Sequence, residues 1–260
     1  MNRTALLWKD PPPDWRRRLD ACVTDAAAAM SGTTRVYFRA DDVAVPGRRL
    51  ASLMDLFIRH GTPLAMAVVP AWLTRPRWET IAAIGRPSRH LWCWHQHGWR
   101  HHNHEPEGKK QEFGPSRLVG DLRRDVDRGR RRLQSIMGSD FFPVFTPPWN
   151  RCSDLTLDYL ERSGYRAVSR SRHSLPPAPR GIPDLFMGVD LHTRRDPTPQ
   201  AGWQRLLAEL FENLTQPSCG IMIHHRLMNS AAFECLDQLL ALIHRHGRME
   251  KRSFPSLCPR

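Results

Sequence analysis

The chain has 260 residues, 40% of them hydrophobic, which is enough to bury one core, and we expect a single domain over residues 1–260. The formal net charge is +13, but only four of the 39 basic residues are lysine and the arginines are spread along the chain. We therefore expect a solvated basic surface, no nucleic-acid partner and no integral membrane segment, while an anionic ligand stays open.

Apolar periodicity predicts helices that alternate with strands along most of the chain. Helices are expected at 15–30, 48–59, 75–84, 116–137, 153–162, 203–214 and 230–245. Strands are expected at 36–40, 64–69, 90–95, 141–145, 165–169 and 220–224, with an extended segment at 184–190. The run 64–69 is continuously apolar, as in a parallel strand that is buried on both faces. A Pro-rich loop at 176–183 and a polar tail at 248–260 complete the pattern.

Strands separated by helices of this length predict βα units and a parallel sheet. About seven units fit an α/β fold, an incomplete or distorted (β/α) barrel, with a catalytic core of about residues 34–246 after the helix at 15–30. A doubly wound open sheet is the alternative. In either fold the chemistry lies at the carboxyl ends of the strands, where the following motifs are found.

The first motif is Asp41-Asp42, which closes the strand at 36–40. Neighbouring side chains on a strand point to opposite faces, so both carboxylates reach one site only if the chain is already leaving strand geometry. Two carboxylates at the end of an apolar strand are costly unless something pairs them. From these residues alone, a ligand site and a solvated pair before the next helix are equally open.

Histidines cluster after the strand at 90–95. Five of the thirteen fall within ten residues, namely His95, His97, His101, His102 and His104. His97 and His101 are four residues apart, so one helical turn or a tight loop puts both rings on the same side. Two imidazoles placed in this way commonly bind one metal ion, and we favour that interpretation over surface or core histidines.

Two further motifs follow strands. Residues 147–149 (Pro-Pro-Trp) fix the backbone and present an aromatic face that suits a sugar ring, although a rigid loop that plugs the barrel end explains them equally well. Residues 221–223 end an apolar strand just before His224 and His225. A histidine in that place can act as a general acid, or it can be a polar residue at the rim.

Taken in order, the four motifs resemble those of the polysaccharide deacetylase family (NodB homology, carbohydrate esterase type) over about residues 34–226. Asp41-Asp42 matches the aspartate pair of the first family motif, and His97-Gly98-Trp99-Arg100-His101 matches His-[Ser/Thr]-x-x-His. Thr146-Pro147-Pro148-Trp149 is similar to Arg-x-Pro-[Trp/Tyr], and Ile221 to His224 matches the final Leu-x-His.

The resemblance implies a metal-dependent hydrolase that removes an acetyl group from an acetylated sugar, with an N-acetyl group expected before an O-acetyl group. It implies Asp41 as the catalytic base and His224 as the acid, although strand facing alone does not choose between His224 and His225. The implied metal ligands are Asp42, His97 and His101, and such a donor set favours Zn²⁺. The substrate-binding residues expected are Pro148, Trp149, Asn150 and Arg151.

Three positions depart from the family pattern. Gly98 stands where Ser or Thr is usual, and Thr146 stands where the family has the arginine that orients the base. Arg39 and Arg151 are the candidates to replace that arginine. The fourth family motif, an aspartate near a tryptophan, has only Asp190-Leu191-His192 as a counterpart.

Two other functions stay open. His95-x-His97 is also the metal-binding pair of amidohydrolase-like hydrolases, although that layout normally places the pair on the first barrel strand. A non-catalytic sugar-binding relative of the deacetylases would keep the barrel without turnover, and the missing motif arginine supports this alternative.

The expected location is the cytoplasm. The N-terminus lacks the apolar stretch of an export signal, and the six cysteines form no Cys-x-x-Cys pair, which is typical of free thiols in a reducing compartment. We therefore expect a soluble or carrier-linked acetylated sugar made inside the cell. The arginine excess and Lys109-Lys110, just beyond the metal histidines, would suit a nucleotide or lipid phosphate carrier, or both lysines are ordinary exposed loop residues. The sequence does not indicate an oligomeric state.

Overall fold

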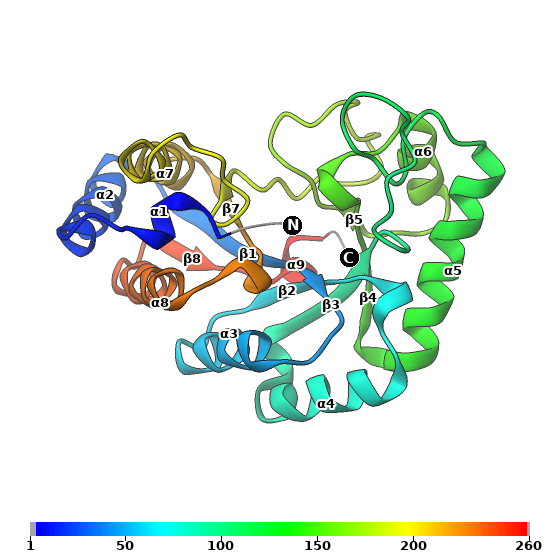
Figure 1. Ribbon diagram of the computed structural model, residues 1–260, viewed down its shortest axis with the longest axis horizontal. Helices are drawn as coiled ribbons and strands as arrows, with labels where there is room; N and C mark the ends of the chain where they lie inside the picture. The colour runs from blue at the N-terminus through cyan, green and yellow to red at the C-terminus, as the bar shows by residue number, and fades with distance from the viewer. Residues whose placement is uncertain (1–3, 259–260) are drawn as a thin grey trace. The chain divides into compact units, whose positions relative to one another are not determined.

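The computed structural model describes residues 4–258, and this part of the chain forms an α/β fold in which strands alternate with helices (Figure 1). The strands are β1 (Thr34–Val43), β2 (Leu64–Val68), β3 (Trp92–His97), β4 (Phe141–Thr146), β5 (Ala167–Val168), β6 (Val189–Asp190), β7 (Ser218–Ile223) and β8 (Met249–Lys251). The helices are α1 (Leu6–Lys9), α2 (Trp15–Ala29), α3 (Arg48–Arg59), α4 (Arg75–Gly85), α5 (Val119–Met137), α6 (Asp154–Arg162), α7 (Pro199–Leu214), α8 (Ser230–Arg245) and α9 (Phe254–Leu257).

The strand order identifies the fold class. Neighbouring strands follow the order β5-β4-β3-β2-β1-β7-β6, and β8 pairs with β1 beside this path. Each described pair, such as β1 with β7 and β3 with β4, is parallel. This is the order of a seven-stranded (β/α) barrel that is open between β5 and β6, whereas a doubly wound sheet would reverse its order in the middle. The predicted incomplete (β/α) barrel is therefore confirmed.

The chain divides into two compact units. Among the described residues, unit 1 contains 4–40, 47–64 and 187–253, and unit 2 contains 41–46, 65–186 and 254–258. The single domain expected from the sequence stays a prediction.

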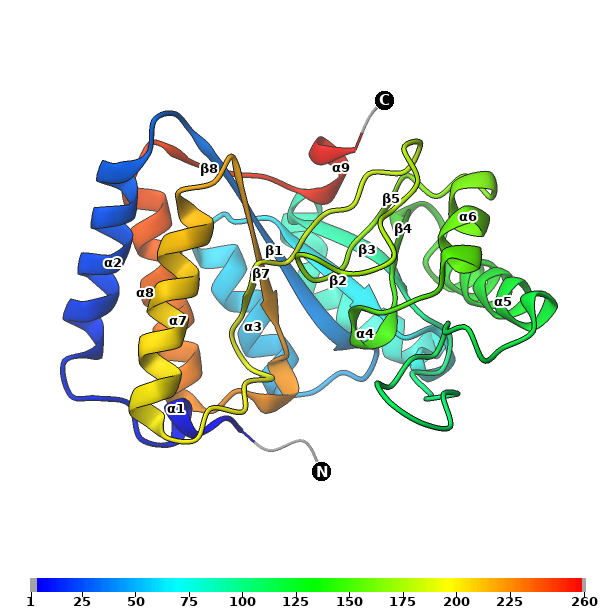
Figure 2. The same ribbon diagram turned by 90° about the horizontal axis from the view of Figure 1, so that it is seen from above.

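Unit 1 is built around α2, α7 and α8, which lie side by side (Figure 2). Three tryptophans join its helices, because the ring of Trp203 contacts those of Trp8 and Trp15 at centre distances of 5.5 and 5.8 Å. The indole N–H of Trp8 donates to the carbonyl of Leu191 at 2.8 Å, and that of Trp203 donates to the carbonyl of Leu7 at 3.1 Å. These large rings are thus buried without a polar cost.

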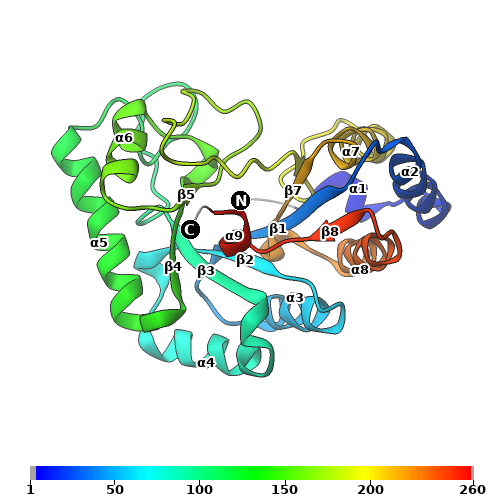
Figure 3. The same ribbon diagram turned by 180° about the vertical axis from the view of Figure 1, so that it is seen from behind.

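Unit 2 places α4 and α5 along β3 and β4 (Figure 3). Its core joins α5, α6 and β4, and its buried members are Phe113, Leu122, Val126, Phe145, Cys152, Leu157, Leu160, Tyr165, Val168 and Ile182. Gln96 on β3 fixes this strand to α5, because its amide donates to the carbonyl of Val126 at 3.1 Å and accepts from the hydroxyl of Tyr165 at 2.6 Å. Gly129 makes room for this amide, since a Cβ there would lie 2.2 Å from Gln96 Nε2.

The predicted elements differ from the structure mainly at their ends. Helix α7 begins at Pro199, four residues before the expected start at 203, because Thr198 caps it by accepting from the N–H of Ala201 at 3.1 Å. Strand β3 runs to His97, two residues beyond the expected end at 95. The expected polar tail holds two elements, since β8 pairs in parallel with the start of β1 and Phe254 of α9 is buried.

Candidate metal centre

The centre begins where β1 ends. Asp41 is buried, with 3% of its surface exposed, and Asp42 has a φ of 61°, in the left-handed region. A left-handed residue breaks the alternation of side chains along a strand, which is the departure from strand geometry that the sequence required for this pair. Such a conformation is rare in residues other than glycine and often marks a functional site.

Asp42, His97 and His101 lie together in unit 2. One possible ligand atom from each residue lies within 4.8 Å of the others. Asp42 Oδ1 is 3.5 Å from His97 Nε2 and 3.3 Å from His101 Nε2. Two imidazoles and one carboxylate are the donor set of many catalytic zinc sites, in which remaining positions are left for water and substrate. The residues present therefore fit a divalent ion of this type.

The backbone of β4 selects the tautomer of His97. His97 Nδ1 donates a hydrogen bond to the carbonyl of Thr146 at 3.0 Å, so the lone pair is left on Nε2, the atom that faces Asp42. A second hydrogen bond of this kind orients most histidines that bind metal ions. The hydroxyl of Thr146 bonds to His95 Nε2 at 2.9 Å. His95 is accordingly outside the group of possible ligands, although it precedes His97 by two residues.

A tight loop, and not a helical turn, brings His101 to His97. Gly98 and His101 both have a φ of 58°. The loop wraps around the buried carboxylate of Glu112, which accepts from the N–H of Trp99 at 3.1 Å and from that of Arg100 at 2.6 Å. Glu112 could not be selected from the sequence, because it is 15 residues from His97 and has no motif around it.

Glu112 also explains the glycine in the second motif. A Cβ at Gly98 would lie 2.2 Å from Glu112 Oε2 and 2.6 Å from the ring of Pro148. The Ser or Thr that is usual in the deacetylase motif would therefore collide with both groups. In this chain a carboxylate from outside the motif holds the loop at the place where a hydroxyl would stand.

The charges of the centre affect its histidines in opposite directions. Burial, followed by the neighbouring His97, lowers the pKa of His101 to about 4. Burial also acts to lower the pKa of His97, but the hydrogen bond that the protonated ring donates to Asp42 and the charges of Asp41 and Asp42 outweigh that effect and raise the pKa. Burial raises the pKa of Glu112, and the backbone N–H groups of the loop oppose this rise. His101 is thus neutral near pH 7 and ready to bind a metal ion.

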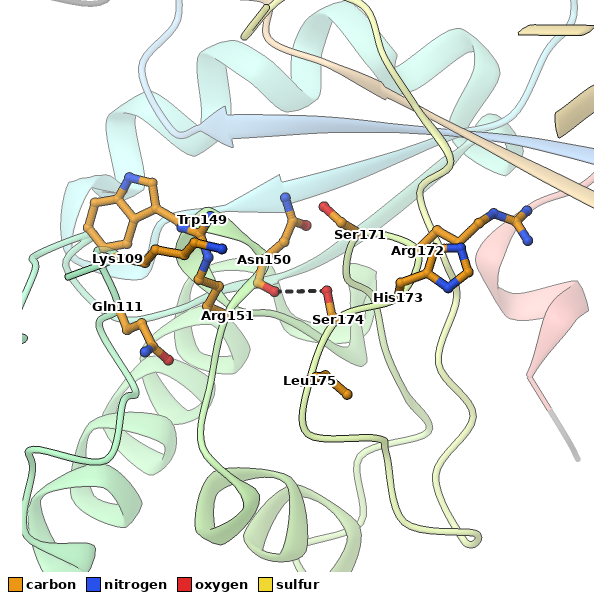
Figure 4. A pocket seen from close by; sticks show the side chains of 10 residues that line it. All are labelled: Lys109, Gln111, Trp149, Asn150, Arg151, Ser171, Arg172, His173, Ser174 and Leu175. Atoms are coloured by element: carbon orange, nitrogen blue, oxygen red, sulfur yellow. Dashed lines mark hydrogen bonds between the residues drawn. The ribbon is translucent and has the colours of Figure 1, made fainter. Parts of the chain in front are cut away.

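The predicted substrate residues follow β4. Pro148 is buried, and Trp149 and Asn150 adopt left-handed conformations with φ of 56° and 61°. The ring of Trp149 lies 4.5 Å from that of His101, measured between centres. Trp149, Asn150 and Arg151 also line a cavity (Figure 4). A strained turn therefore points an aromatic side chain toward the candidate ligands.

The remaining candidates lie in unit 1. His224 and the buried His225 follow β7, as expected. The backbone N–H of His224 donates to His192 Nδ1 at 3.1 Å. Asp190 accepts from the N–H groups of His192 and Thr193 at 2.9 and 3.0 Å, so its carboxylate stabilises its own turn.

The sequence and the fold were compared with those of known proteins. No protein-family model matches the sequence, and no curated protein matches it. A CE4 esterase from Streptococcus mutans superposes with a TM-score of 0.61 at 14% identity, over 89% of this chain and 90% of the esterase. The Xyl-CE4 domain of a multidomain xylanase from the hindgut metagenome of Trinervitermes trinervoides gives 0.58 at 12% identity, over 86% and 89%. The fold is that of the CE4 polysaccharide deacetylases.

A CE4 family pseudoenzyme from Bacillus anthracis has the same fold, with a TM-score of 0.56 at 12% identity over 86% of this chain and 65% of that one. The CE4 fold thus occurs in proteins with and without turnover, and activity has to be argued from the residues of the site. Within residues 4–258, no helix has both the length and the apolar character of a membrane span.

Proposed function

We propose that this protein is a Zn²⁺-dependent hydrolase that removes the acetyl group from an acetylated sugar, with an N-acetyl group favoured over an O-acetyl group. The observation that carries the proposal is the grouping of Asp42, His97 and His101 on a CE4 fold, with one ligand atom of each within 4.8 Å. The hydrogen bond from His97 to Thr146 supports it, because it leaves the correct nitrogen for a metal ion.

In the proposed reaction, Asp42, His97 and His101 hold the ion. When bound, the ion supplies Lewis-acid chemistry that makes water a better nucleophile and polarises the acetyl carbonyl. Asp41 accepts the proton that the attacking water loses, and His224 donates a proton to the departing nitrogen. The water oxygen bonds to the acetyl carbon, the carbon–nitrogen bond breaks, and acetate and an amino sugar are released. The roles of Asp41 and His224 come from the motif resemblance.

The sugar would contact the segment after β4. Trp149 can stack on a pyranose ring, Asn150 can bond to its hydroxyl groups, and the guanidinium of Arg151 offers donors to another part of the substrate. Pro148 holds the backbone of this turn. We further propose a soluble or carrier-linked substrate in the cytoplasm. None of the six cysteines, which all lie within residues 4–258, is part of a disulfide, and this agrees with a reducing compartment.

A non-catalytic sugar-binding protein is the second candidate, because Thr146 stands at the place of the motif arginine. Release of acetate from a generic acetyl ester by the zinc-loaded protein would exclude it. The amidohydrolase-like alternative has less support, since the ring of His95 is engaged with Thr146 and lies outside the ligand group.

The direct test of the proposed centre is metal content. We expect the double variant His97→Ala with His101→Ala to lose most of its zinc and all deacetylase activity. The matched control is His102→Ala with His104→Ala, which removes two imidazoles from the same segment but none from the ligand group. Zinc per protein is measured by mass spectrometry of the purified proteins.

Full zinc occupancy in the His97 and His101 variant would contradict the proposed ligands. Equal losses in both double variants would show that the segment, and not these two rings, is responsible. If the zinc-loaded wild-type protein releases no acetate from any acetylated sugar or ester, the proposed metal ligands stand but the proposed activity is wrong.

A further inference from the structure

Unit 2 holds a cavity beside the candidate metal centre. Its volume is about 450 Å³, within the range of sites for small organic ligands. Lys109 and Gln111 line it from the loop before Glu112, and the rest of its wall comes from segments 149–151 and 171–175. Figure 4 shows these groups around the cavity, with Ser174 Oγ donating to the carbonyl of Asn150 at 3.3 Å.

The lining is basic. Lys109, Arg151 and Arg172 give it three cationic side chains, and His173 adds an imidazole. No acidic side chain is among the described residues that line it. Gln111, Asn150 and two serines supply further polar groups that can donate hydrogen bonds. A cavity with several cations and no carboxylate is suited to an anion, and Arg and Lys are the side chains that bind phosphate most often.

Trp149 connects this cavity with the metal centre. It lines the cavity, and its ring lies 4.5 Å from that of His101. A small molecule that occupies the cavity and contacts Trp149 can therefore reach the candidate metal-binding residues with its other end. Lys110, next to Lys109 in the chain, is exposed and does not line the cavity, so the two lysines expected to act together from the sequence are separated by the fold.

We propose that this cavity binds the phosphate groups of a diphosphate-linked acetylated sugar while the acetyl group lies at the metal centre. This inference rests on the proposed deacetylase activity and specifies its substrate class. The volume exceeds what a single phosphate needs, and it leaves room for part of the group beyond the phosphates. A neutral sugar polymer would not use the three cations. The diphosphate can belong to a nucleotide or to a lipid carrier, because both present the same chemistry.

Binding is tested first, without turnover. Uridine diphosphate is titrated calorimetrically into the zinc-loaded protein and into the variant Lys109→Ala with Arg151→Ala. The matched control is Lys110→Ala with Arg180→Ala, which removes one lysine and one arginine from exposed positions of the same unit outside the cavity. Loss of two charge-assisted contacts should weaken binding about tenfold or more in the cavity variant. The control should bind as the wild type does.

Turnover is tested second, with a nucleoside diphosphate N-acetyl sugar, a polyprenyl diphosphate N-acetyl sugar in detergent, the free N-acetyl monosaccharide and a chitin-type oligomer. We expect one of the diphosphate substrates to be preferred, which identifies the carrier. The ratio of its kcat/KM to that of the free monosaccharide should fall about tenfold or more in the cavity variant. Both effects come from the same lost phosphate contacts.

Equal binding of uridine diphosphate by the cavity variant and the wild type would overturn the proposal, since the ligand would then be held elsewhere, for example on the metal ion. Preference for the chitin-type oligomer would overturn it as well. If no substrate releases acetate, the deacetylase activity fails, but the calorimetric comparison still decides whether the cavity is a phosphate site.

Discussion

Thr146 contacts two histidines in different ways, and this double contact shows how single residues shape the centre. Its carbonyl accepts from His97 Nδ1 at 3.0 Å, and its hydroxyl bonds to His95 Nε2 at 2.9 Å. The first contact uses the backbone and would survive any side chain at this position, so the missing motif arginine does not disturb the orientation of His97. In the proposed mechanism, what the chain lacks at this position is a positive charge that would act on the base. The absence of this positive charge should therefore affect Asp41 most.

The proposed role of Asp41 as proton acceptor can be tested by a single substitution. Asparagine has nearly the same shape as aspartate but does not accept a proton, so Asp41→Asn should keep its zinc and lose about 10²–10⁴ in kcat. Asp42→Asn is the informative comparison, because loss of a candidate ligand should lower the zinc content as well. Zinc per protein and kcat are measured on the same preparations. Near-normal turnover of Asp41→Asn would remove this residue from the mechanism.

Three residues, 98–100, join the two candidate ligand histidines His97 and His101, and the shape of this loop depends on close packing around one carboxylate. Gly98 has a φ of 58°, and a Cβ there would lie 2.2 Å from Glu112 Oε2. We predict that Gly98→Ala lowers the free energy of unfolding by about 1–3 kcal/mol, through backbone strain and overpacking. Gly120→Ala is the control, because no atom lies within 4 Å of its new Cβ and alanine is a better helix former than glycine at this position near the start of helix α5.

Denaturant unfolding of the two glycine variants, each compared with the wild type, measures the difference. If Gly98→Ala is as stable as the wild type, Glu112 moves away easily and does not hold the loop.

The charge of Glu112 gives a separate prediction for the same loop. Glu112→Gln keeps the size of the side chain, but its amide N–H₂ would face the N–H groups of Trp99 or Arg100, where the carboxylate now accepts from both. A residue that orients the segment of a metal ligand commonly changes metal affinity by about 10–100-fold when it is replaced. We expect a weakening of zinc binding in this range, measured by competition with a chelator.

Glu107→Gln, at an exposed position of the same segment, serves as the control and should bind zinc as the wild type does. Because Glu112 acts only through the loop, kcat at saturating zinc should change much less than zinc affinity. A large loss of kcat with unchanged zinc affinity would contradict a positioning role.

Most helices and strands could be predicted, because the pattern that specifies each of them lies within a short stretch of sequence. The run 64–69 is apolar throughout and the helix at 48–59 carries its apolar residues on one face, so β2 and α3 could be predicted from the residues alone. The four-residue spacing of His97 and His101 predicts that their rings lie close together, as they do. Glu112 was missed because its contacts to the N–H groups of the loop are made across a segment with no regular pattern. The tail was missed because β8 has three residues and is stabilised by its pairing with β1, a contact between distant parts of the sequence.

For the molecule as a whole, the two units contain different parts of the proposed chemistry. The candidate ligands, Glu112 and the basic cavity lie in unit 2, whereas His192 and His224 lie in unit 1. Strand β1 belongs to both, since its residues up to Ala40 are in unit 1 and Asp41 and Asp42 are in unit 2. The candidate metal ligands and the proposed phosphate-binding residues therefore all belong to unit 2, and a residue of unit 1 can be replaced without removing any of them.

His192 makes the stability of the whole molecule depend on pH. Its ring is buried, and burial, followed by the positive charges of His224 and His225, lowers its pKa well below the ordinary value. Protonation of Nδ1 would also remove the acceptor for the N–H of His224. In the unfolded chain the ring takes a proton near its ordinary pKa of about 6.5, so the unfolded state binds more protons below that pH. The stability that His192 contributes is complete above about pH 7 and is lost as the pH falls through about 6.5.

We therefore predict that the wild type loses more stability between pH 7.5 and 5.5 than the variant His192→Gln, by about 1 kcal/mol, because glutamine can still accept from the N–H of His224 but does not titrate. The measurement is urea unfolding of both proteins at the two pH values, with the exposed His90→Gln as a control for the loss of an imidazole. Comparing differences between pH values cancels any constant effect of the substitution. The contribution of the metal-centre histidines is the same in both proteins and cancels too. If His192→Gln and the wild type lose the same stability on acidification, the ring of His192 is protonated in the folded protein and its burial does not exclude the charge.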